Sequence, residues 1–381
     1  MTSTVAPLPL TLTLSGQYLR LWTIVTILVI GACEPVPSSV STATPDVIPV
    51  FAYYYIWFDV GSWNRAKVDY PLLGNYSSDD IEIMRQHIQW AKAAGINGFI
   101  ISWKSSDKLN PRLGQLIKLA DRENFKLAII YQGLDFERRP LPSEQIAADL
   151  DYFITHYANH SVFDIYEKPL IIWSGTWKYS REEITSVTQG RRDHLLILAS
   201  EKNVKGYQRL ADLVDGDAYY WSSVNPDTFP KYPEKLSSMG QIVHANGGLW
   251  IAPVAPGFDA RLIGGTTIVE RKNGETLERE LNTALLSSPD AIGLISWNEF
   301  SENSHIEPSV NYGSHYLEIL TDIRDAASPQ GNDLNSSAPA NILNEVGIGR
   351  VFALGILGCL VLIGLVAIIR RDRPKNEHIS T

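Results

Sequence analysis

Three glutamates, Glu299, Glu302 and Glu307, fall in the segment ISWNEFSENSHIEPS at residues 295–309. An apolar strand-like run precedes them, and a charge just beyond a buried strand is costly unless it is solvated, paired or used. Glycosidic cleavage needs a carboxylic acid to protonate the leaving oxygen and a second carboxylate to activate a nucleophile or stabilise the positive ring. Glu299 and Glu302 lie three apart and can both reach one pocket, where their repulsion raises one pKa. The alternative is a solvated loop with ordinary surface glutamates.

The middle of the chain alternates between strand-like and helix-like segments. Apolar runs of strand length occur at residues 48–58, 96–103, 127–131, 170–173, 195–199, 218–221, 249–254 and 291–297. Helical spacing occurs at residues 78–94, 113–122, 143–157, 181–189, 207–214, 232–246, 277–287 and 312–325. Strands buried on both faces and alternating with helices favour a parallel sheet. Eight such units predict an α/β fold, the (β/α)8 TIM barrel. An open doubly wound sheet is disfavoured because no Gly-rich nucleotide fingerprint follows the first run.

Aromatic side chains gather where the predicted strands end. In a (β/α)8 barrel the active site lies at the C-terminal ends of the strands. Trp and Tyr stack on the apolar faces of sugars and hydrogen-bond their hydroxyls, which suits a carbohydrate cleft. The candidates for sugar contact at this rim include Tyr54, Trp57, Trp103, Tyr131 and Trp221. The alternative is that these rings cap the core of the barrel.

The composition excludes several other classes. The chain has 381 residues, a formal net charge of −9 and a pI near 5.4, which argues against a nucleic-acid partner. Its two cysteines, Cys33 and Cys359, are too few for a disulfide scaffold or a Cys-rich zinc site. No H-E-x-x-H motif or clustered ligand set occurs, so we predict neither a metal nor a cofactor. His87 and other histidines on helical segments are predicted to be surface or helix-packing residues.

The N-terminal region is predicted to be a secretion signal. Arg20 precedes an apolar run of 12 residues, LWTIVTILVIGA, which is too short for a comfortable membrane span. The sequence IGAC at residues 30–33 resembles a bacterial lipobox, so lipidation of Cys33 competes with an ordinary cleaved signal or a short anchor. We therefore expect a signal over residues 1–33, a linker over 34–47 and a catalytic domain over 48–327.

A membrane anchor is predicted near the C-terminus. Residues 351–369 are 19 consecutive residues without a charge, and four basic residues follow within residues 370–375. Positive charge beside a span marks its cytoplasmic side. The sequence thus predicts a stalk over 328–346, a transmembrane helix over 347–369 and a cytoplasmic tail over 370–381. The catalytic domain is then expected outside the cytoplasm, on a single-pass protein of the cell membrane.

The segment with the glutamates resembles the motif N-E-W-x-E-G-x-x-I-E-P of glycoside hydrolase family 99, the endo-α-mannosidase group, and a similar segment of related bacterial polysaccharide-locus proteins. Weaker matches follow in chain order over about residues 48–325, namely YYIW at 54–57, GNYSSD at 74–79, AGINGF at 94–99, PGFD at 256–259 and YG at 312–313. The departures include Phe300 in place of the usual Trp and Asn303 in place of the usual Gly. Both glutamates remain, but the residues that would select mannose differ.

The resemblance implies a (β/α)8 barrel that hydrolyses α-mannosides with retention. It implies that Glu299 removes the proton from the sugar's 2-hydroxyl, which attacks the anomeric carbon, and that Glu302 acts as acid and then base. It adds candidates for holding sugar hydroxyls, among them Tyr54, Trp57, Trp103, Asp259, Arg261 and Asn298, whereas Glu307 orders the loop or contacts sugar. His305 is the histidine nearest this proposed site.

Three functions remain open from the sequence. The first is a membrane-anchored extracytoplasmic glycosidase with a glycan substrate. The second is a protein of polysaccharide assembly or modification, and the third is a glycan-binding barrel without catalysis. Paired glutamates favour the first over the third.

Overall fold

The computed structural model describes residues 48–65 and 67–327. The predicted signal, linker, stalk, transmembrane helix and cytoplasmic tail lie outside these residues. Within the described ranges, no helix is long and apolar enough to cross a membrane.

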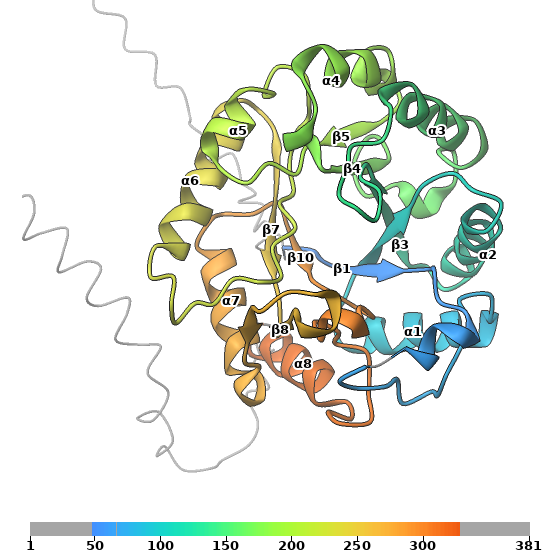
Figure 1. Ribbon diagram of the computed structural model, residues 1–381, viewed down its shortest axis with the longest axis vertical. Helices are drawn as coiled ribbons and strands as arrows, with labels where there is room; N and C mark the ends of the chain where they lie inside the picture. Colours follow the sequence, from blue (N-terminus) through green and yellow to red (C-terminus); the bar gives the residue numbers. More distant parts are fainter. Residues whose placement is uncertain (1–47, 66, 328–381) are drawn as a thin grey trace, which may run out of the picture. The chain divides into compact units, whose positions relative to one another are not determined.

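Eight parallel strands form the centre of the domain (Figure 1). They are β1 (Val50–Tyr55), β2 (Gly98–Trp103), β3 (Lys126–Gln132), β4 (Leu170–Ser174), β5 (Leu196–Leu198), β6 (Gly216–Asp217), β7 (Leu249–Val254) and β10 (Ala291–Leu294). The sheet order is β5-β4-β3-β2-β1-β10-β7-β6. A parallel bridge between Ala199 and Asp217 joins the two outer strands. The strands therefore follow one another around a ring, which confirms the predicted (β/α)8 barrel.

Eight α-helices surround the strands (Figure 1). They are α1 (Ile81–Ala93), α2 (Leu109–Arg122), α3 (Ser143–His156), α4 (Arg181–Thr188), α5 (Val204–Gln208), α6 (Tyr232–Ala245), α7 (Glu275–Leu285) and α8 (His315–Ala327). Most coincide with the predicted segments to within a few residues. The exception is α5, which begins before residue 207 because the Asn203 side chain accepts a hydrogen bond from the Gly206 N–H at 3.0 Å and caps a helix there. Strand β6 likewise precedes the predicted run at 218–221.

The loops contain short strands and 3-10 helices. A two-stranded antiparallel ribbon follows β7 and consists of β8 (Phe258–Asp259) and β9 (Ile268–Val269). The 3-10 helices are η1 (Val60–Asn64), η2 (Ser161–Phe163), η3 (Thr176–Lys178), η4 (Arg191–Asp193), η5 (Arg261–Ile263), η6 (Lys272–Gly274) and η7 (Phe300–Glu302). The last of these directly follows β10 and carries the glutamate segment.

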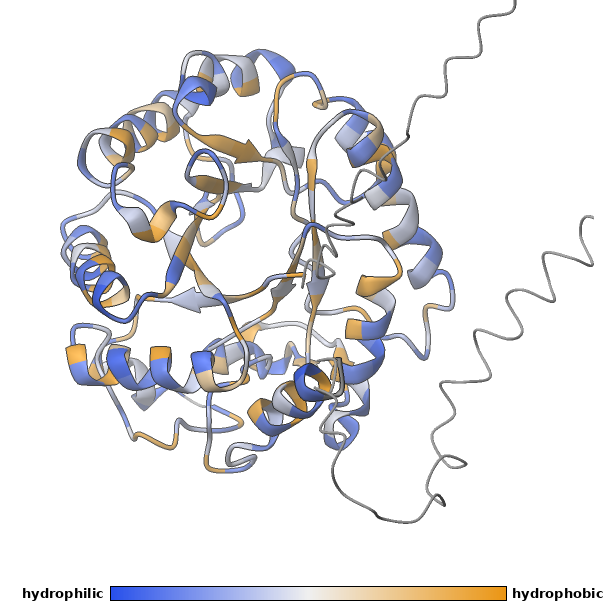
Figure 2. Ribbon diagram, turned by 180° about the vertical axis from the view of Figure 1, so that it is seen from behind, coloured by the Kyte–Doolittle hydropathy of each residue, from blue (hydrophilic) through white to orange (hydrophobic). Residues whose placement is uncertain are grey.

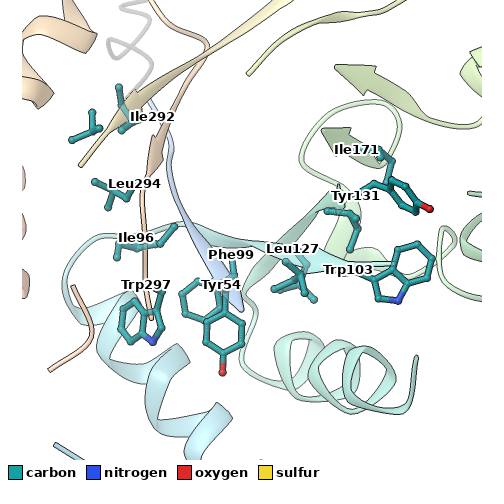
Figure 3. Packing of buried hydrophobic residues seen from close by; sticks show 14 of the residues in the cluster. Tyr54, Ile96, Phe99, Trp103, Leu127, Tyr131, Ile171, Ile292, Leu294 and Trp297 are labelled. Carbon is teal, nitrogen blue, oxygen red and sulfur yellow. The ribbon is translucent and has the colours of Figure 1, made fainter. Parts of the chain in front are cut away.

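Each strand buries both of its faces, in two separate apolar layers. Alternate residues such as Phe51, Tyr53 and Ile100 point into the barrel and form one cluster. Their neighbours, such as Tyr54 and Phe99, point outward and form a second cluster beneath the helices (Figure 3). Several strands are orange over most of their length, whereas the helices mix orange and blue residues (Figure 2). Which residues face the mouth of the barrel therefore depends on this alternation.

Candidate active site

The glutamate segment is a closed turn at the C-terminal end of β10. The Ser296 N–H donates to the Ser304 carbonyl at 2.8 Å, and the Ile306 N–H donates to the Ser296 carbonyl at 2.9 Å. Within this turn, Glu299 is the residue before η7, and its carboxylate accepts the Ser301 N–H at 3.1 Å. The turn thus holds Glu299 and Glu302 at the two ends of a single helical turn.

Both glutamates are in an environment that favours the protonated form. Burial, and then the charge of Glu302, raises the pKa of Glu299 to about 8, while the Lys67 ammonium opposes the shift. Burial also raises the pKa of Glu302, against the charge of Arg138 and a hydrogen bond with Ser222. Among the described residues, the Glu302 Oε2 atom is buried and has no hydrogen-bond partner. A buried carboxyl with a free oxygen and a raised pKa is suited to donating a proton.

Two tyrosines line the barrel interior beside the glutamates. The Tyr55 hydroxyl donates to the Tyr220 hydroxyl at 2.7 Å. After burial, the charges of Glu299 and Glu302 further raise the pKa of Tyr55, which places the phenol near both carboxyls. The Trp57 ring lies 4.4 Å from the Tyr55 ring, and Trp57 is 38% exposed. Of the predicted rim aromatics, Trp57 is the one that offers an exposed face next to this pair.

Asn298 is fully buried and all its side-chain polar groups are used within the protein. Its Oδ1 accepts the Tyr55 N–H at 2.8 Å, and its Nδ2 donates to the Tyr55 carbonyl at 3.0 Å and to the Tyr76 hydroxyl at 3.2 Å. The sequence predicted that this amide holds a sugar hydroxyl. The structure instead gives it a supporting role, which is to fix the backbone of Tyr55 beside Glu299.

Glu307 belongs to a buried network behind the turn. Its carboxylate lies 3.1 Å from the His87 Nε2 and accepts the Tyr76 hydroxyl at 2.9 Å. The His87 Nδ1 in turn lies 3.0 Å from the Tyr54 hydroxyl. Neither Glu307 nor Tyr54 has a group free for a sugar here, so the first of the two predicted roles of Glu307, ordering the loop, fits its contacts. His87, predicted to be a surface or packing residue, is a buried link in this network.

His305 is also enclosed by protein. Its Nε2 lies 3.2 Å from the Asp69 carboxylate, and its ring stacks on Phe300 with centroids 3.9 Å apart. Burial lowers the pKa of His305 to about 4, against the hydrogen bond that Asp69 accepts from the ring. The imidazole is therefore neutral at physiological pH, and it packs against Phe300 within the glutamate turn. Contact between His305 and a substrate does not follow from this placement.

Three more predicted rim aromatics point away from the barrel. Trp103 and Tyr131 are 0% exposed, and they donate to the side chains of Asn110 at 3.1 Å and Asp149 at 2.9 Å respectively (Figure 3). Trp221 packs on Tyr232 and is partly buried. Because side chains alternate along β2 and β3, the mouth receives Ser102 and Gln132 instead, and Tyr220, in the connection after β6, contacts Tyr55. Because both faces of each strand carry apolar residues, the sequence does not indicate which face points into the barrel.

Asp259 and Arg261 form an ion pair on the β8–β9 ribbon. The guanidinium donates to both carboxylate oxygens of Asp259, at 2.9 Å from Nε and 2.5 Å from Nη2. The Arg261 side chain is 63% exposed, whereas that of Asp259 is 4% exposed. Asp259 therefore orients the arginine, and Arg261 is the member of the pair that remains accessible to a ligand.

Fold and site together define a (β/α)8 barrel of the glycoside hydrolase kind, with paired carboxyls on the turn after its last strand. In the described ranges, no three His, Cys, Asp or Glu residues are arranged to hold a metal ion. The model of glycosyl hydrolase family 99 matches residues 62–328, and the chain belongs to this family.

Individual relatives support the same assignment. The chain is 24% identical over 269 residues to the human glycoprotein endo-alpha-1,2-mannosidase-like protein, covering 63% of this chain and 57% of the relative. It is 24% identical over 264 residues to the rat glycoprotein endo-alpha-1,2-mannosidase, covering 63% of this chain and 56% of the relative. The chain thus spans less than two thirds of these relatives.

Solved structures show the same fold. The GH99 endo-alpha-mannosidase of Bacteroides thetaiotaomicron, in complex with bis-tris-propane, superimposes with a TM-score of 0.65 at 23% identity, covering 73% of this chain and 96% of that one. A glycoside hydrolase-like protein superimposes with a TM-score of 0.52 at 18% identity, covering 72% of this chain and 93% of that one.

Proposed function

We propose that this protein is a glycosidase that hydrolyses α-mannoside-like glycans with retention of configuration, using Glu299 and Glu302. The main support is the environment of Glu302, because it combines a raised pKa with a buried oxygen that has no hydrogen-bond partner among the described residues. A glycosidic oxygen placed at that atom would complete its hydrogen bonding. The printed names of the relatives, endo-alpha-1,2-mannosidases, support the choice of α-mannosides.

The proposed reaction has two steps. In the first, Glu299 takes the proton of the sugar's 2-hydroxyl, the O2–C1 bond forms, and the C1–O bond to the leaving group breaks as Glu302 protonates that oxygen. In the second, Glu302 takes a proton from water, whose oxygen attacks C1, and the O2–C1 bond breaks as Glu299 returns the proton to O2. Each step inverts the anomeric carbon, so the product retains the configuration of the substrate.

This reaction requires that Glu302 is protonated and that Glu299 is ionised when the substrate is bound. In the free site both carboxyls have a raised pKa, and the charges of Lys67 and Arg138 oppose the rise at Glu299 and at Glu302 respectively. The shared proton belongs to the pair as a whole. We infer that the bound sugar assigns it, because the 2-hydroxyl donates to Glu299 and the glycosidic oxygen accepts from Glu302. Tyr55 and Tyr220 would then contact the sugar ring from the barrel side.

The cellular setting is part of the proposal. The uncharged residues 351–369 and the basic residues after them support a single membrane span with the catalytic domain outside the cytoplasm. The N-terminal apolar run supports export in the same direction.

The test is hydrolysis of α-mannans by the full-length protein, with the product anomer read by NMR. Glu302→Gln removes the acid but keeps the shape, so activity should fall by roughly 10²–10⁴-fold while mannan binding survives. Glu234→Gln is the matched control, since Glu234 lies exposed on α6. Equal activity of wild type and Glu302→Gln would contradict the assignment. An inverted product would overturn the two-step route, and mannan binding without turnover would favour the glycan-binding barrel.

A further inference from the structure

Four basic side chains follow four consecutive strands at the C-terminal end of the barrel, three of them in strand-to-helix connections and one on a helix. Arg138 follows β3, Lys178 follows β4, Lys202 follows β5, and Lys235 lies on α6 after β6. Among the described residues, none of the four has a carboxylate within 4.0 Å. The neighbouring Arg139, by contrast, pairs with two acids.

Lys202 lies within range of the charges of the other three residues or of their neighbours. Burial lowers the pKa of Lys202, and the charges of Arg138 and Lys178 lower it further, whereas the charge of Glu201 raises it. Burial also lowers the pKa of Lys235, with Lys202 adding to the effect. The chain as a whole has a net charge of −9, so a group of basic residues is opposite in sign to the net charge of the protein. Unpaired like charges at close range destabilise the folded protein unless an anion joins them.

Aromatic rings position two of these ammonium groups. The Lys202 Nζ lies 4.1 Å from the centre of the Trp177 ring, and the Lys235 Nζ lies 3.9 Å from that of the Trp221 ring. A cation held over a ring face keeps its N–H donors available to a further ligand. Trp177 is also partly exposed, as a platform for a sugar would be.

The cluster begins beside the catalytic pair. The charge of Arg138 is the main influence that opposes the burial-driven rise in the pKa of Glu302. Arg138 has a φ of +60°, an uncommon backbone conformation for a residue with a side chain. The loop that carries it is tightly closed, because the Arg138 N–H donates to the Asp135 carbonyl at 3.0 Å. The backbone that carries the exposed Arg138 side chain is thus held in a defined turn.

We propose that Arg138, Lys178, Lys202 and Lys235 bind an anionic group of the glycan, a phosphate, sulfate or carboxylate, at a subsite next to Glu302. This inference rests on the proposed function and narrows its substrate class to negatively charged glycans. Together the four cations supply the donors that a tetrahedral or planar oxyanion needs. The bound anion removes the mutual repulsion of the cluster.

The test compares the binding of one mannan with and without its charges. The full-length protein is prepared in the Glu299→Gln background, so that turnover does not consume the ligand. The probes are a phosphorylated α-mannan, the same mannan after enzymatic removal of phosphate, and the mannan oxidised to carboxylates at C6. We expect at least about tenfold tighter binding of the charged forms in 50 mM salt, and a smaller preference in 200 mM salt.

Variants connect the preference to the cluster. Arg138→Gln with Lys202→Gln should abolish the preference for the charged mannan and leave binding of the neutral mannan intact. Lys202→Arg should retain the preference, and Lys118→Gln, an exposed lysine on α2, is the distant control. Because these changes remove repulsion, the double variant should unfold at the wild-type temperature or above, which verifies that it is folded.

Three outcomes would overturn the proposal. The first is equal affinity for charged and neutral mannan, and the second is a preference that persists in the folded double variant. Binding to phosphatidylglycerol vesicles without any preference among glycans would also overturn it, and would assign the cluster to a lipid surface. Hydrolysis of neutral mannan by the wild type would leave the proposed function standing in each case, so the two failures are distinguishable.

Discussion

The side chain of Asn298 pairs with both backbone polar groups of Tyr55, accepting the N–H at 2.8 Å and donating to the carbonyl at 3.0 Å. The amide thereby joins the end of β1 to the turn after β10, across 243 positions of the chain. Its neighbour in sequence is Glu299, and Tyr55 is the phenol beside both glutamates. One buried amide therefore sets the spacing between two walls of the candidate active site.

Asn298→Ala should strongly destabilise the protein. The change leaves the N–H and carbonyl of Tyr55 buried without partners, and an unsatisfied buried group costs about 1–3 kcal/mol. We expect the free energy of unfolding, measured by urea denaturation, to fall by about 2–5 kcal/mol. Asn246→Ala is the control, because that exposed amide makes one hydrogen bond at the end of α6. A loss equal to the control would contradict the role given to Asn298.

Tyr220→Phe should reduce activity more than stability. The variant keeps the ring that packs on Tyr53 but removes the oxygen that accepts the Tyr55 hydroxyl. We expect kcat/KM on mannan to fall by roughly tenfold or more, since a mispositioned phenol weakens transition-state contacts. The unfolding midpoint should change little. Tyr70→Phe, at an exposed tyrosine whose hydroxyl has no hydrogen bond among the described residues, should match wild type. An unaffected kcat/KM in Tyr220→Phe would contradict this role.

The pH dependence of kcat/KM should extend to unusually high pH. Burial raises the pKa of Glu299 to about 8, so the pair keeps a proton well above the usual range of carboxyl groups. Activity should decline only near pH 8, where the last proton leaves and no acid remains. Arg138→Gln removes the charge that lowers the pKa of Glu302 and should move this decline to higher pH.

Arg139→Gln is the matched control for that shift, because Arg139 is the adjacent residue and its charge is already paired with Asp135 and Glu137. A wild-type decline near pH 5 would show that the carboxyls titrate normally, contrary to their burial.

Glu299→Gln should stabilise the protein at alkaline pH. A carboxyl with a raised folded-state pKa contributes stability that is complete below its unfolded pKa and is lost as pH rises through the folded value. For Glu299 this window runs from about 4.5 to about 8. Glutamine does not titrate, so the unfolding temperature of the variant should exceed that of wild type increasingly from pH 5 to pH 8.

Thermal unfolding across this range measures the effect, and Glu234→Gln should follow wild type at every pH. A constant difference between Glu299→Gln and wild type would mean that the folded-state pKa of Glu299 is unshifted.

Most of the fold was predictable from local patterns. Alternating apolar and amphipathic segments predicted the eight strands and eight helices, because each barrel unit is specified by its own short stretch of chain. The misplaced elements are β6 and α5, where a short pairing and the cap at Asn203 set the boundaries. The boundaries of both elements depend on a few residues, which an analysis of hydrophobic periodicity over a longer window does not detect.

The site was predictable only in its central motif. The glutamate pair stood out since two carboxyls directly after an apolar run need a reason to be there. His87 and Asp69 were missed as partners of Glu307 and His305, because they approach from 220 and 236 positions away in the chain. No spacing rule connects residues so distant in sequence.

The sequence by itself determined the barrel, the family resemblance and the position of Glu299 and Glu302 after the last strand. Only the tertiary structure decided which strand-end residues enter the mouth, so that Tyr55 lines the site while its neighbour Tyr54 packs beneath a helix. The physical reason is that both faces of each strand are buried, one against the barrel interior and one against the helices. Both faces therefore favour apolar and aromatic residues, and the alternation that distinguishes them leaves no trace in hydropathy.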